Sequence, residues 1–191
     1  MKFDCTDSLL HLKQGHILLC PTDTVWGISC DATNESAVNN IILLKKRTAE
    51  KSFIVLVNSL DMLGLYIDSF PNFAVDILEY SELPVTIIFP KGVKLSPNVA
   101  KDDGSIAIRL VKPINEEAKF CAELIRKLNK PIVSTSANFS NEATPRTFKE
   151  INEVVKSGVD FIVPYFQNNS NLRHPSKIIK MNDDGTFKVL R

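Results

Sequence analysis

The chain has 191 residues, of which 44% are hydrophobic, and its formal net charge is +1. This length is sufficient to bury a sizeable core without disulfides or metals, so we expect a single domain over residues 1–191. The near-neutral charge excludes the overall basic excess typical of many nucleic-acid-binding proteins, so any basic patch must be local.

The four cysteines, at positions 5, 20, 30 and 121, form no C-x-x-C pair and have no histidine at metal-ligand spacing. We interpret them as free thiols that pack in the core of a protein from a reducing compartment. Residues 1–7 include acidic side chains and no long apolar run, which argues against a signal peptide or a membrane span. The sequence therefore predicts a cytoplasmic protein with no membrane partner.

Apolar residues at helical spacing predict a helix over residues 7–14, and a buried strand over residues 17–20 follows Gly15. Residues 21–27 then interrupt the apolar run with two threonines and Asp23. Turn chemistry alone accounts for Pro21, Asp23 and Gly27. Small polar groups at the end of a strand also line ligand crevices in α/β domains, so both interpretations stay open.

A basic cluster lies between a helix predicted over residues 34–44, with Asn34 as its N-cap, and a buried strand over residues 53–57. Its cations are Lys45, Lys46, Arg47 and Lys51. The helix dipole explains cations at a helix end, but Lys51 lies beyond that end. We interpret the cluster as a grip for polyphosphate, with Lys45 and Arg47 pointing outward from the helix terminus.

The middle of the chain predicts short helices over residues 60–65 and 73–80 and strands over residues 84–90 and 104–111. Within the second strand, Arg109 lies between Ile108 and Leu110. Because an unpaired buried guanidinium is too costly, we expect Arg109 at the strand's end or paired with an anion.

The last third predicts a helix over residues 116–128 and a strand over residues 131–133, followed by the polar segment 134–140. This segment is either a capped turn before the next helix or part of a ligand site on the same side as residues 21–27. After this segment we expect a helix over residues 147–156, a core strand over residues 161–164, and a hairpin of residues 176–181 and 187–190. All these elements belong to one predicted α/β domain.

The sequence contains no G-x-x-x-x-G-K and no G-x-G-x-x-G, so side chains must bind any phosphate. Its three histidines offer no order typical of nucleophilic catalysis, and His11 and His16 are expected on a solvated face. This pattern favours catalysis by positioning and charge stabilisation rather than a covalent intermediate.

Five motifs resemble, in order and spacing, the YrdC family of threonylcarbamoyl-adenylate synthases, and the likeness runs from about Ser8 to Arg191. They are Pro21-Thr22-Asp23-Thr24-Val25-Trp26-Gly27, Lys45-x-Arg47, Pro84-Val85-Thr86, Ser105-Ile106-Ala107-Ile108-Arg109 and Ser134-Thr135-Ser136-Ala137-Asn138-Phe139-Ser140. The resemblance implies an α/β fold in which a twisted mixed sheet with flanking helices surrounds a concave basic cavity, in the short single-domain bacterial form.

The resemblance also implies a nucleotidyltransferase reaction in which L-threonine, bicarbonate or CO2, and ATP give threonylcarbamoyl-AMP and pyrophosphate for the threonylcarbamoyladenosine modification of tRNA. Mg2+ would accompany the ATP, with no metal ligand predicted among the protein side chains. Contact with tRNA and with the downstream threonylcarbamoyl-transferase proteins is implied as well.

The resemblance assigns the site residues by their places in the motifs. Lys45 and Arg47 are implied as catalytic; Thr24, Leu56, Arg109, Ser134 and Ser176 as the threonine site; Arg47, Lys51, Ser105, Ser136, Thr144 and Arg191 as the ATP site; and Thr22, Asn138 and Arg173 as further cavity residues. The chain departs from the family pattern at Ser52, where proline is usual, at Glu82-Leu83, where tryptophan-proline-glycine is expected before Pro84, and at Leu56, where some relatives have histidine.

Two alternatives to this enzyme remain. The same cations could bind an RNA backbone, which predicts binding that weakens steeply with salt and ignores threonine. A carbamoyl-transfer domain of the kind found in hydrogenase-maturation proteins would share the fold, but the chain lacks zinc-finger cysteines.

Overall fold

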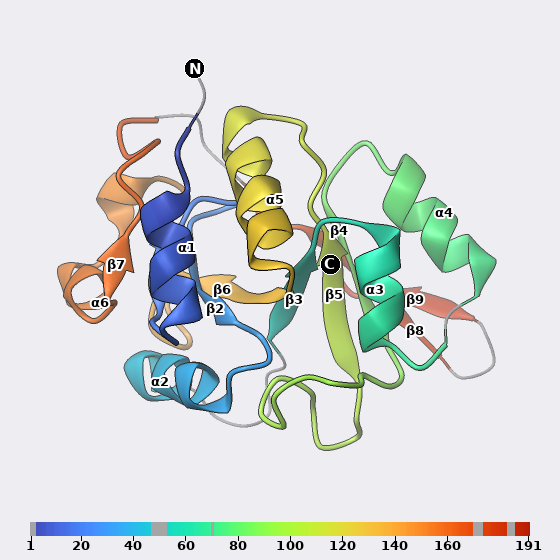
Figure 1. Cartoon of the computed structure of the whole chain (residues 1–191). Helices are drawn as coiled ribbons and strands as arrows, with labels where there is room; N and C mark the ends of the chain where they lie inside the picture. Colours follow the sequence, from blue (N-terminus) through green and yellow to red (C-terminus); the bar gives the residue numbers. More distant parts are fainter. Residues whose placement is uncertain (1–2, 47–52, 70, 170–173, 183–185) are drawn as a thin grey trace.

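The computed structural model describes residues 3–46, 53–69, 71–169, 174–182 and 186–191 (Figure 1). The described strands form one nine-stranded sheet in the order β7-β1-β2-β6-β3-β5-β4-β8-β9. Their bounds are β1 (Leu18–Cys20), β2 (Gly27–Asp31), β3 (Ile54–Val57), β4 (Val85–Phe89), β5 (Ile106–Leu110), β6 (Ile132–Ser136), β7 (Phe161–Ile162), β8 (Lys177–Met181) and β9 (Phe187–Val189).

The sheet is mixed. β1 with β7, β3 with β5, and β4 with β8 pair in parallel, whereas the other neighbouring strands pair antiparallel. Together with the flanking helices, this arrangement confirms the twisted mixed α/β sheet predicted from the sequence.

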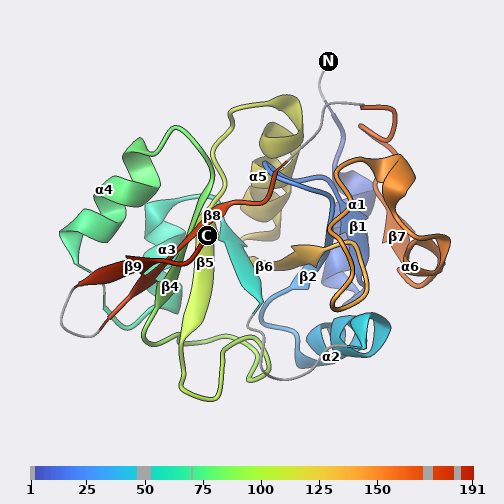
Figure 2. The ribbon, with the colours of Figure 1, turned by 180° about the vertical axis from the view of Figure 1, so that it is seen from behind.

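The helices are α1 (Thr6–Lys13), α2 (Glu35–Lys45), α3 (Leu60–Tyr66), α4 (Asn72–Tyr80), α5 (Glu116–Leu128) and α6 (Glu153–Ser157), with a 3-10 turn over Phe148–Glu150. Helices α1, α3, α4 and α5 cover one face of the sheet, and Figure 2 shows the other face in front of them. Among the described residues, no helix combines the length and the apolar character that crossing a membrane requires.

Alternation along the strands separates the two faces of the sheet. Fully buried apolar residues such as Val55, Ile87, Ile108 and Val133 belong to the core. The residues between them point to the opposite face, and the register aligns these in rows. One row runs from Ser134 on β6 through Ile54 on β3 and Ala107 on β5 to Ile88 on β4.

Most predicted elements have the expected places, and local chemistry explains their ends. The Asn34 side chain caps α2 by accepting a hydrogen bond from the Ala37 amide, as predicted. Asn115 caps α5 in the same way through the Ala118 amide. Helix α5 matches the predicted bounds and ends at Asn129, which adopts a left-handed conformation (φ 56°).

Two predicted elements near the C-terminal end need correction. The predicted helix over residues 147–156 is interrupted, because the Asn152 side chain accepts a hydrogen bond from the Val154 amide and starts the separate helix α6. The predicted core strand over residues 161–164 is the two-residue strand β7, which lies half-buried at the sheet edge. The hairpin of β8 and β9 is confirmed, although residues 183–185 of its turn lie outside the described residues.

The strand predicted over residues 131–133 continues as β6 to Ser136, so the first hydroxyl groups of the segment 134–140 belong to a strand. No helix follows directly, which makes the capped-turn interpretation wrong. His11 and His16 are half-buried rather than solvated, because their rings pack together and His11 stacks on Phe161.

Candidate active site

A cavity of about 500 Å³ lies over the row of Ser134, Ile54, Ala107 and Ile88, on the opposite face of the sheet from the core. Residues of β2, β3, β4, β5, β6 and β8 line it, and the segment after β6 forms one wall. Its lining residues are Thr24, Val25, Gly27, Lys45, Ile54, Ile88, Lys101, Ala107, Arg109, Ser134, Thr135, Ser136, Asn138, Phe139, Ser140, Asn141, Glu142, Thr144, Pro175, Ser176, Ile178 and Arg191. Positive side chains outnumber the one carboxylate, Glu142, among these residues, which suits an anionic ligand.

The turn between β1 and β2 presents Thr24 to the cavity. The Thr22 hydroxyl donates to the Val25 carbonyl (2.8 Å) and accepts from the Thr24 amide (3.1 Å). In this buried turn the Thr22 side chain therefore satisfies backbone groups of the turn itself. Thr22 therefore shapes the turn, and Thr24 is the residue that it exposes to the cavity.

Arg109 on β5 lies at one end of the cavity, which we call the Arg109 end and define by Thr24, Arg109, Ser134 and Ser176. Only 3% of Arg109 is exposed, and its Nη2 forms an ion pair of 2.9 Å with Asp23 Oδ1. Burial raises the pKa of Asp23 above its usual value, and the positive charge of Arg109 offsets part of this rise. The anion expected beside Arg109 is therefore present within the protein.

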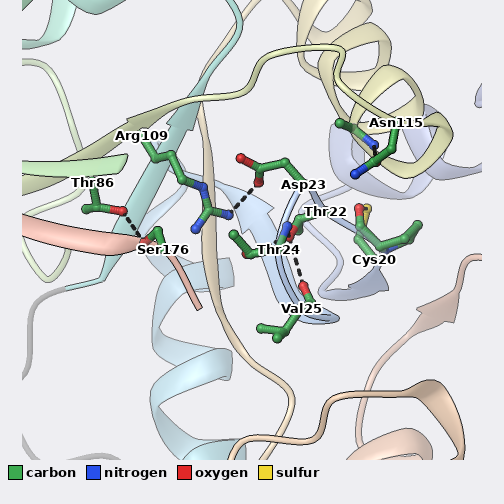
Figure 3. Close-up of polar contacts among 11 residues, drawn as sticks. Cys20, Thr22, Asp23, Thr24, Val25, Thr86, Arg109, Asn115 and Ser176 are labelled. Atoms are coloured by element: carbon green, nitrogen blue, oxygen red, sulfur yellow. Dashed lines mark hydrogen bonds and ion pairs between the residues drawn. The ribbon is translucent and has the colours of Figure 1, made fainter. Parts of the chain in front are cut away.

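The other side of Arg109 faces a pair of hydroxyl groups (Figure 3). Thr86 lies opposite Arg109 in the register of β4 and β5, and its hydroxyl is 2.7 Å from that of Ser176. Arg191 Nε donates to the Ser176 carbonyl (3.1 Å). Burial lowers the pKa of Arg191, and the like charge of Arg109 lowers it further, so an anion placed between the two guanidinium groups would relieve both effects.

Gly27 makes room for Ser134 beside this end of the cavity. A Cβ atom on Gly27 would lie 2.4 Å from Ser134 Oγ and 3.3 Å from the Thr135 carbonyl oxygen. Because Gly27 has no side chain, the Ser134 hydroxyl can lie close to its backbone.

Lys45 organises another wall of the cavity, which we call the loop wall and define as the cavity-lining residues between 136 and 144. Its ammonium group donates to the carbonyl oxygens of Ser136 (2.5 Å) and Asn138 (2.6 Å) and lies 3.4 Å from Asn138 Oδ1. Asn138 Oδ1 also accepts from the Ser136 hydroxyl (2.5 Å), and its Nδ2 donates to the Glu142 carbonyl (2.7 Å). The charge of Lys45 thus holds the loop wall in shape.

This finding corrects the outward orientation predicted for Lys45. The side chain is 3% exposed and points inward, from the same helical face as Ala37 and Ile41. Spacing of four residues from Ile41 places Lys45 on the buried face of α2, and this periodicity was a signal for its burial.

Comparison with known proteins agrees with this geometry. A family model described as "Telomere recombination" and covering the Sua5, YciO and YrdC proteins matches residues 11–191. The chain belongs to the Sua5/YciO/YrdC family. It is 34% identical over 181 residues to a threonylcarbamoyl-AMP synthase of Hahella chejuensis, an alignment that covers 94% of this chain and 93% of that protein.

Two solved structures show the same fold. The crystal structure of P. abyssi Sua5 complexed with L-threonine superposes with a TM-score of 0.84 at 21% identity and covers 100% of this chain. This chain spans 55% of the length of that protein. The E. coli YciO structure has a TM-score of 0.79 at 22% identity, covering 97% of this chain and 86% of that one.

The residues that the family resemblance assigned divide into three groups. Those brought together at the cavity are Thr24, Lys45, Arg109, Ser134, Ser136, Asn138, Thr144, Ser176 and Arg191. Thr22, Leu56 and Ser105 are buried and are not among the lining residues, although Leu56 lies beside Arg109 in the register of β3 and β5. Arg47, Lys51 and Arg173 lie outside the described residues, and with them two of the four cations of the basic cluster.

Sequence reasoning missed three contributors to the site. Asp23 was interpreted as a turn residue, although it lies within a motif of the Sua5/YciO/YrdC family. Thr86 and Gly27 also lie in such motifs, and their roles depend on contacts with Ser176 and Ser134 that are distant in sequence. Only the register of the sheet brings these pairs together.

Proposed function

We propose that this chain is an enzyme, an L-threonylcarbamoyladenylate synthase that converts L-threonine, bicarbonate or CO2, and ATP into threonylcarbamoyl-AMP and pyrophosphate. The supporting observation is one cavity that is lined both by a buried guanidinium end and by a loop wall held by a lysine. The volume of about 500 Å³ is typical of a small-molecule site. The named relative at 34% identity supports the same assignment.

In this proposal, threonine binds at the Arg109 end. The planar guanidinium of Arg109 suits a carboxylate in bidentate geometry. Its Nε is buried and has no hydrogen-bond partner among the described residues, so a donor remains for such an anion. The hydroxyl groups of Thr24, Ser134 and Ser176 surround this end and would bind the polar groups of the amino acid.

ATP then lies along the loop wall. Ser136 and Thr144 supply hydroxyl groups there, and Arg191, which donates to the Ser176 carbonyl, supplies positive charge to the same cavity. Arg47 and Lys51 remain our predicted phosphate contacts by their places in the family motif.

The loop wall fits Mg2+ carried by the nucleotide. Ser140, Asn141 and Glu142 offer oxygen atoms, the ligands that Mg2+ prefers, and Glu142 is the carboxylate among the described lining residues. Such a set suits an ion bound mainly by phosphates. Mg2+ would neutralise charge on the phosphates during transfer.

The reaction needs positioned substrates rather than a covalent enzyme intermediate. The neutral amine of threonine attacks CO2 and gives up a proton to solvent, or attacks bicarbonate with loss of water, to form a carbamate. A carbamate oxygen then attacks the α-phosphorus of ATP, and the bond from that phosphorus to pyrophosphate breaks. Arg109 and the three hydroxyl groups orient the amino acid, while the loop wall and Arg191 stabilise the charge that develops on the phosphates. The adenylate would pass to a threonylcarbamoyl transferase that modifies tRNA.

RNA binding by the same cavity is not favoured. The formal charge of +1 is small for such a role, and the similar proteins carry the name of a synthase.

Pyrophosphate release tests the proposed function. The purified chain with ATP and Mg2+ should release pyrophosphate only when L-threonine and bicarbonate are both present, and Thr24→Val should reduce the rate. Arg126→Ala on the exposed face of α5 serves as a control that keeps the rate. Release that is independent of threonine, or none from folded protein, would contradict the proposal, and tight RNA binding without ATP binding would favour the alternative.

A further inference from the structure

Asp23 is the one described carboxylate in direct ion-pair contact with the Arg109 end, and the chemistry proposed above gives it no part. It is 5% exposed and lies 2.9 Å from Arg109 Nη2. Its turn is fixed on both sides, because Thr22 binds the Thr24 amide and the Val25 carbonyl. A carboxylate fixed in this way can hold the guanidinium group in one orientation.

The guanidinium is occupied on one side only. Nη2 is paired with Asp23, whereas Nε is buried without a hydrogen-bond partner among the described residues. Figure 3 shows Arg109 between Asp23 and the Thr86–Ser176 pair. An incoming carboxylate can therefore bind Arg109 without displacing Asp23, since a guanidinium has five donors.

We propose that Asp23 is a positioning residue for the amino-acid substrate: it holds Arg109 by Nη2 and so keeps the remaining donors directed at the substrate carboxylate. This inference rests on the proposed function for the identity of the carboxylate, which is that of L-threonine. Asp23 does not line the large cavity, so it acts through Arg109 rather than by touching the substrate.

Protonation of Asp23 would release this hold. Burial raises the pKa of Asp23, with Arg109 acting in the opposite direction. The other charged groups around it are Glu82 and Lys112, which share a small second pocket with Asp23, and the ammonium group of Lys112 donates to the Ser81 carbonyl (2.6 Å). Arg191 repels Arg109 from the other side. Threonine affinity should therefore fall as the pH falls through the raised pKa of Asp23.

The test compares Asp23→Asn and Asp23→Glu with a matched control, Asp31→Asn. Asp31 lies at the far end of β2, is also 5% exposed, and pairs with Lys130 at 2.8 Å. Calorimetry should show that Asp23→Asn raises the Kd for L-threonine about ten-fold or more, and leaves that for ATP within about three-fold. Asp23→Glu should recover most of the affinity, and Asp31→Asn should keep it.

The pH profile separates positioning from mere structural support. In the parent chain the threonine Kd should rise on acidification, and in folded Asp23→Asn it should be flat over the same range. If Asp23→Asn does not fold, the pH profile of the parent chain and the threonine Kd of Asp23→Glu still test the positioning role. An unchanged or lower Kd in Asp23→Asn, or a flat parent profile, would overturn the inference.

A measurement without substrate tests the positioning role of Asp23 independently of the proposed function. The Nε–Hε NMR signal of Arg109, assigned by its loss in Arg109→Lys, should exchange slowly with solvent in the parent and in Asp23→Glu, and rapidly in Asp23→Asn. If the signal behaves in this way but L-threonine does not shift it, the proposed function fails while the positioning role stands. A signal indifferent to Asp23→Asn would overturn the positioning role itself.

Discussion

The two walls of the cavity are held by different interactions. At the Arg109 end, side chains from separate elements meet, with the Arg109–Asp23 ion pair beside the Thr86–Ser176 hydroxyl pair. At the loop wall, the Lys45 ammonium group binds backbone carbonyls of Ser136 and Asn138. The first wall depends on two opposite charges, and the second on one charge and the backbone dipoles around it.

This difference predicts different responses to mutation and pH. Loss of one member of a buried ion pair leaves the other charge without compensation, and protonation can relieve it. Loss of Lys45 leaves carbonyl groups without a donor, and no titration can replace that donor. Substitutions at the two walls should therefore be separable by their pH dependence as well as by the substrate that they affect.

The largest effect is expected for Arg109→Met. The substitution leaves the Asp23 carboxylate buried without its counter-ion, so the free energy of unfolding should fall by about 3–5 kcal/mol near neutral pH. Threonine binding should be lost. Denaturant titration and calorimetry measure the two effects.

The sign of the pH dependence provides a check on Arg109→Met. Burial already raises the pKa of Asp23 in the folded state, and removal of Arg109 raises it further. A carboxyl group whose folded pKa is raised contributes stability at low pH that is lost as the pH rises through that pKa. The deficit of the variant should therefore shrink on acidification, and a deficit that is constant with pH would contradict the ion-pair explanation.

Lys45→Met should have the next largest effect, at the loop wall. Two carbonyl groups lose a charged donor, so the free energy of unfolding should fall by about 2–3 kcal/mol. ATP binding should weaken more than threonine binding. The stability deficit should depend little on pH near neutrality, because the carbonyl groups that lose their donor do not titrate.

The adjacent residue gives a matched control for Lys45. Lys46 is exposed, and its ammonium group lies 5.9 Å from the centre of the Phe139 ring. Lys46→Met should change the free energy of unfolding by no more than about 0.5 kcal/mol. Equal losses of stability in Lys45→Met and Lys46→Met would show that the removal of one positive charge, and not the loss of the loop contacts, causes the effect.

Gly27→Ala should have a smaller effect, confined to the Arg109 end. The new methyl group would lie 2.4 Å from Ser134 Oγ, so the Ser134 side chain must move. We expect a loss of about 1–2 kcal/mol of stability and a higher KM for threonine with little change for ATP. Gly64→Ala in α3 has no atom within 4 Å of the added methyl group and should raise stability by about 0.5–1 kcal/mol. The prediction fails if the two variants behave alike.

The smallest effect is expected for the exposed ion pair on α5. Arg126 contacts both oxygen atoms of Glu123, at 2.6 and 2.7 Å, but 62% of its side chain is exposed. Because this pair is screened by solvent, Arg126→Ala should leave the free energy of unfolding nearly unchanged, in contrast to loss of the buried Arg109–Asp23 pair. A loss comparable to that of Arg109→Met would remove the distinction between exposed and buried pairs.

The sequence predicted most elements and one electrostatic requirement of the site. Periodicity and Asn34 located α2, and the cost of burying an unpaired guanidinium predicted Arg109 either at the end of its strand or beside an anion. The sequence could not name Asp23 as that anion, because the two residues are far apart in the chain and meet only through the fold. It placed Lys45 at a helix end, and the spacing from Ile41 signalled its burial. The carbonyl groups that Lys45 binds come from the end of β6 and the segment after it, and the sequence did not show that these lie beside α2.

Local rules failed where a side chain competed with the backbone. Apolar spacing over residues 147–156 favoured one helix, but the Asn152 side chain binds the Val154 amide and divides the segment. For the segment 134–140 the hydroxyl groups left both a capped turn and a ligand site open, whereas pairing with β2 and β3 keeps Ser134 in a strand that lines the cavity. Pairing between strands fixed the conformation of the segment that begins at Ser134, and one sequence alone does not show which strands are neighbours.

A crystal structure of the chain with L-threonine and a non-hydrolysable ATP analogue would test the assignment of the two walls most directly. We predict the threonine carboxylate on Arg109, with Asp23 still paired to Nη2, and the phosphates along the loop wall and Arg191. Phosphates bound to Arg109, with threonine absent from that end, would contradict the assignment.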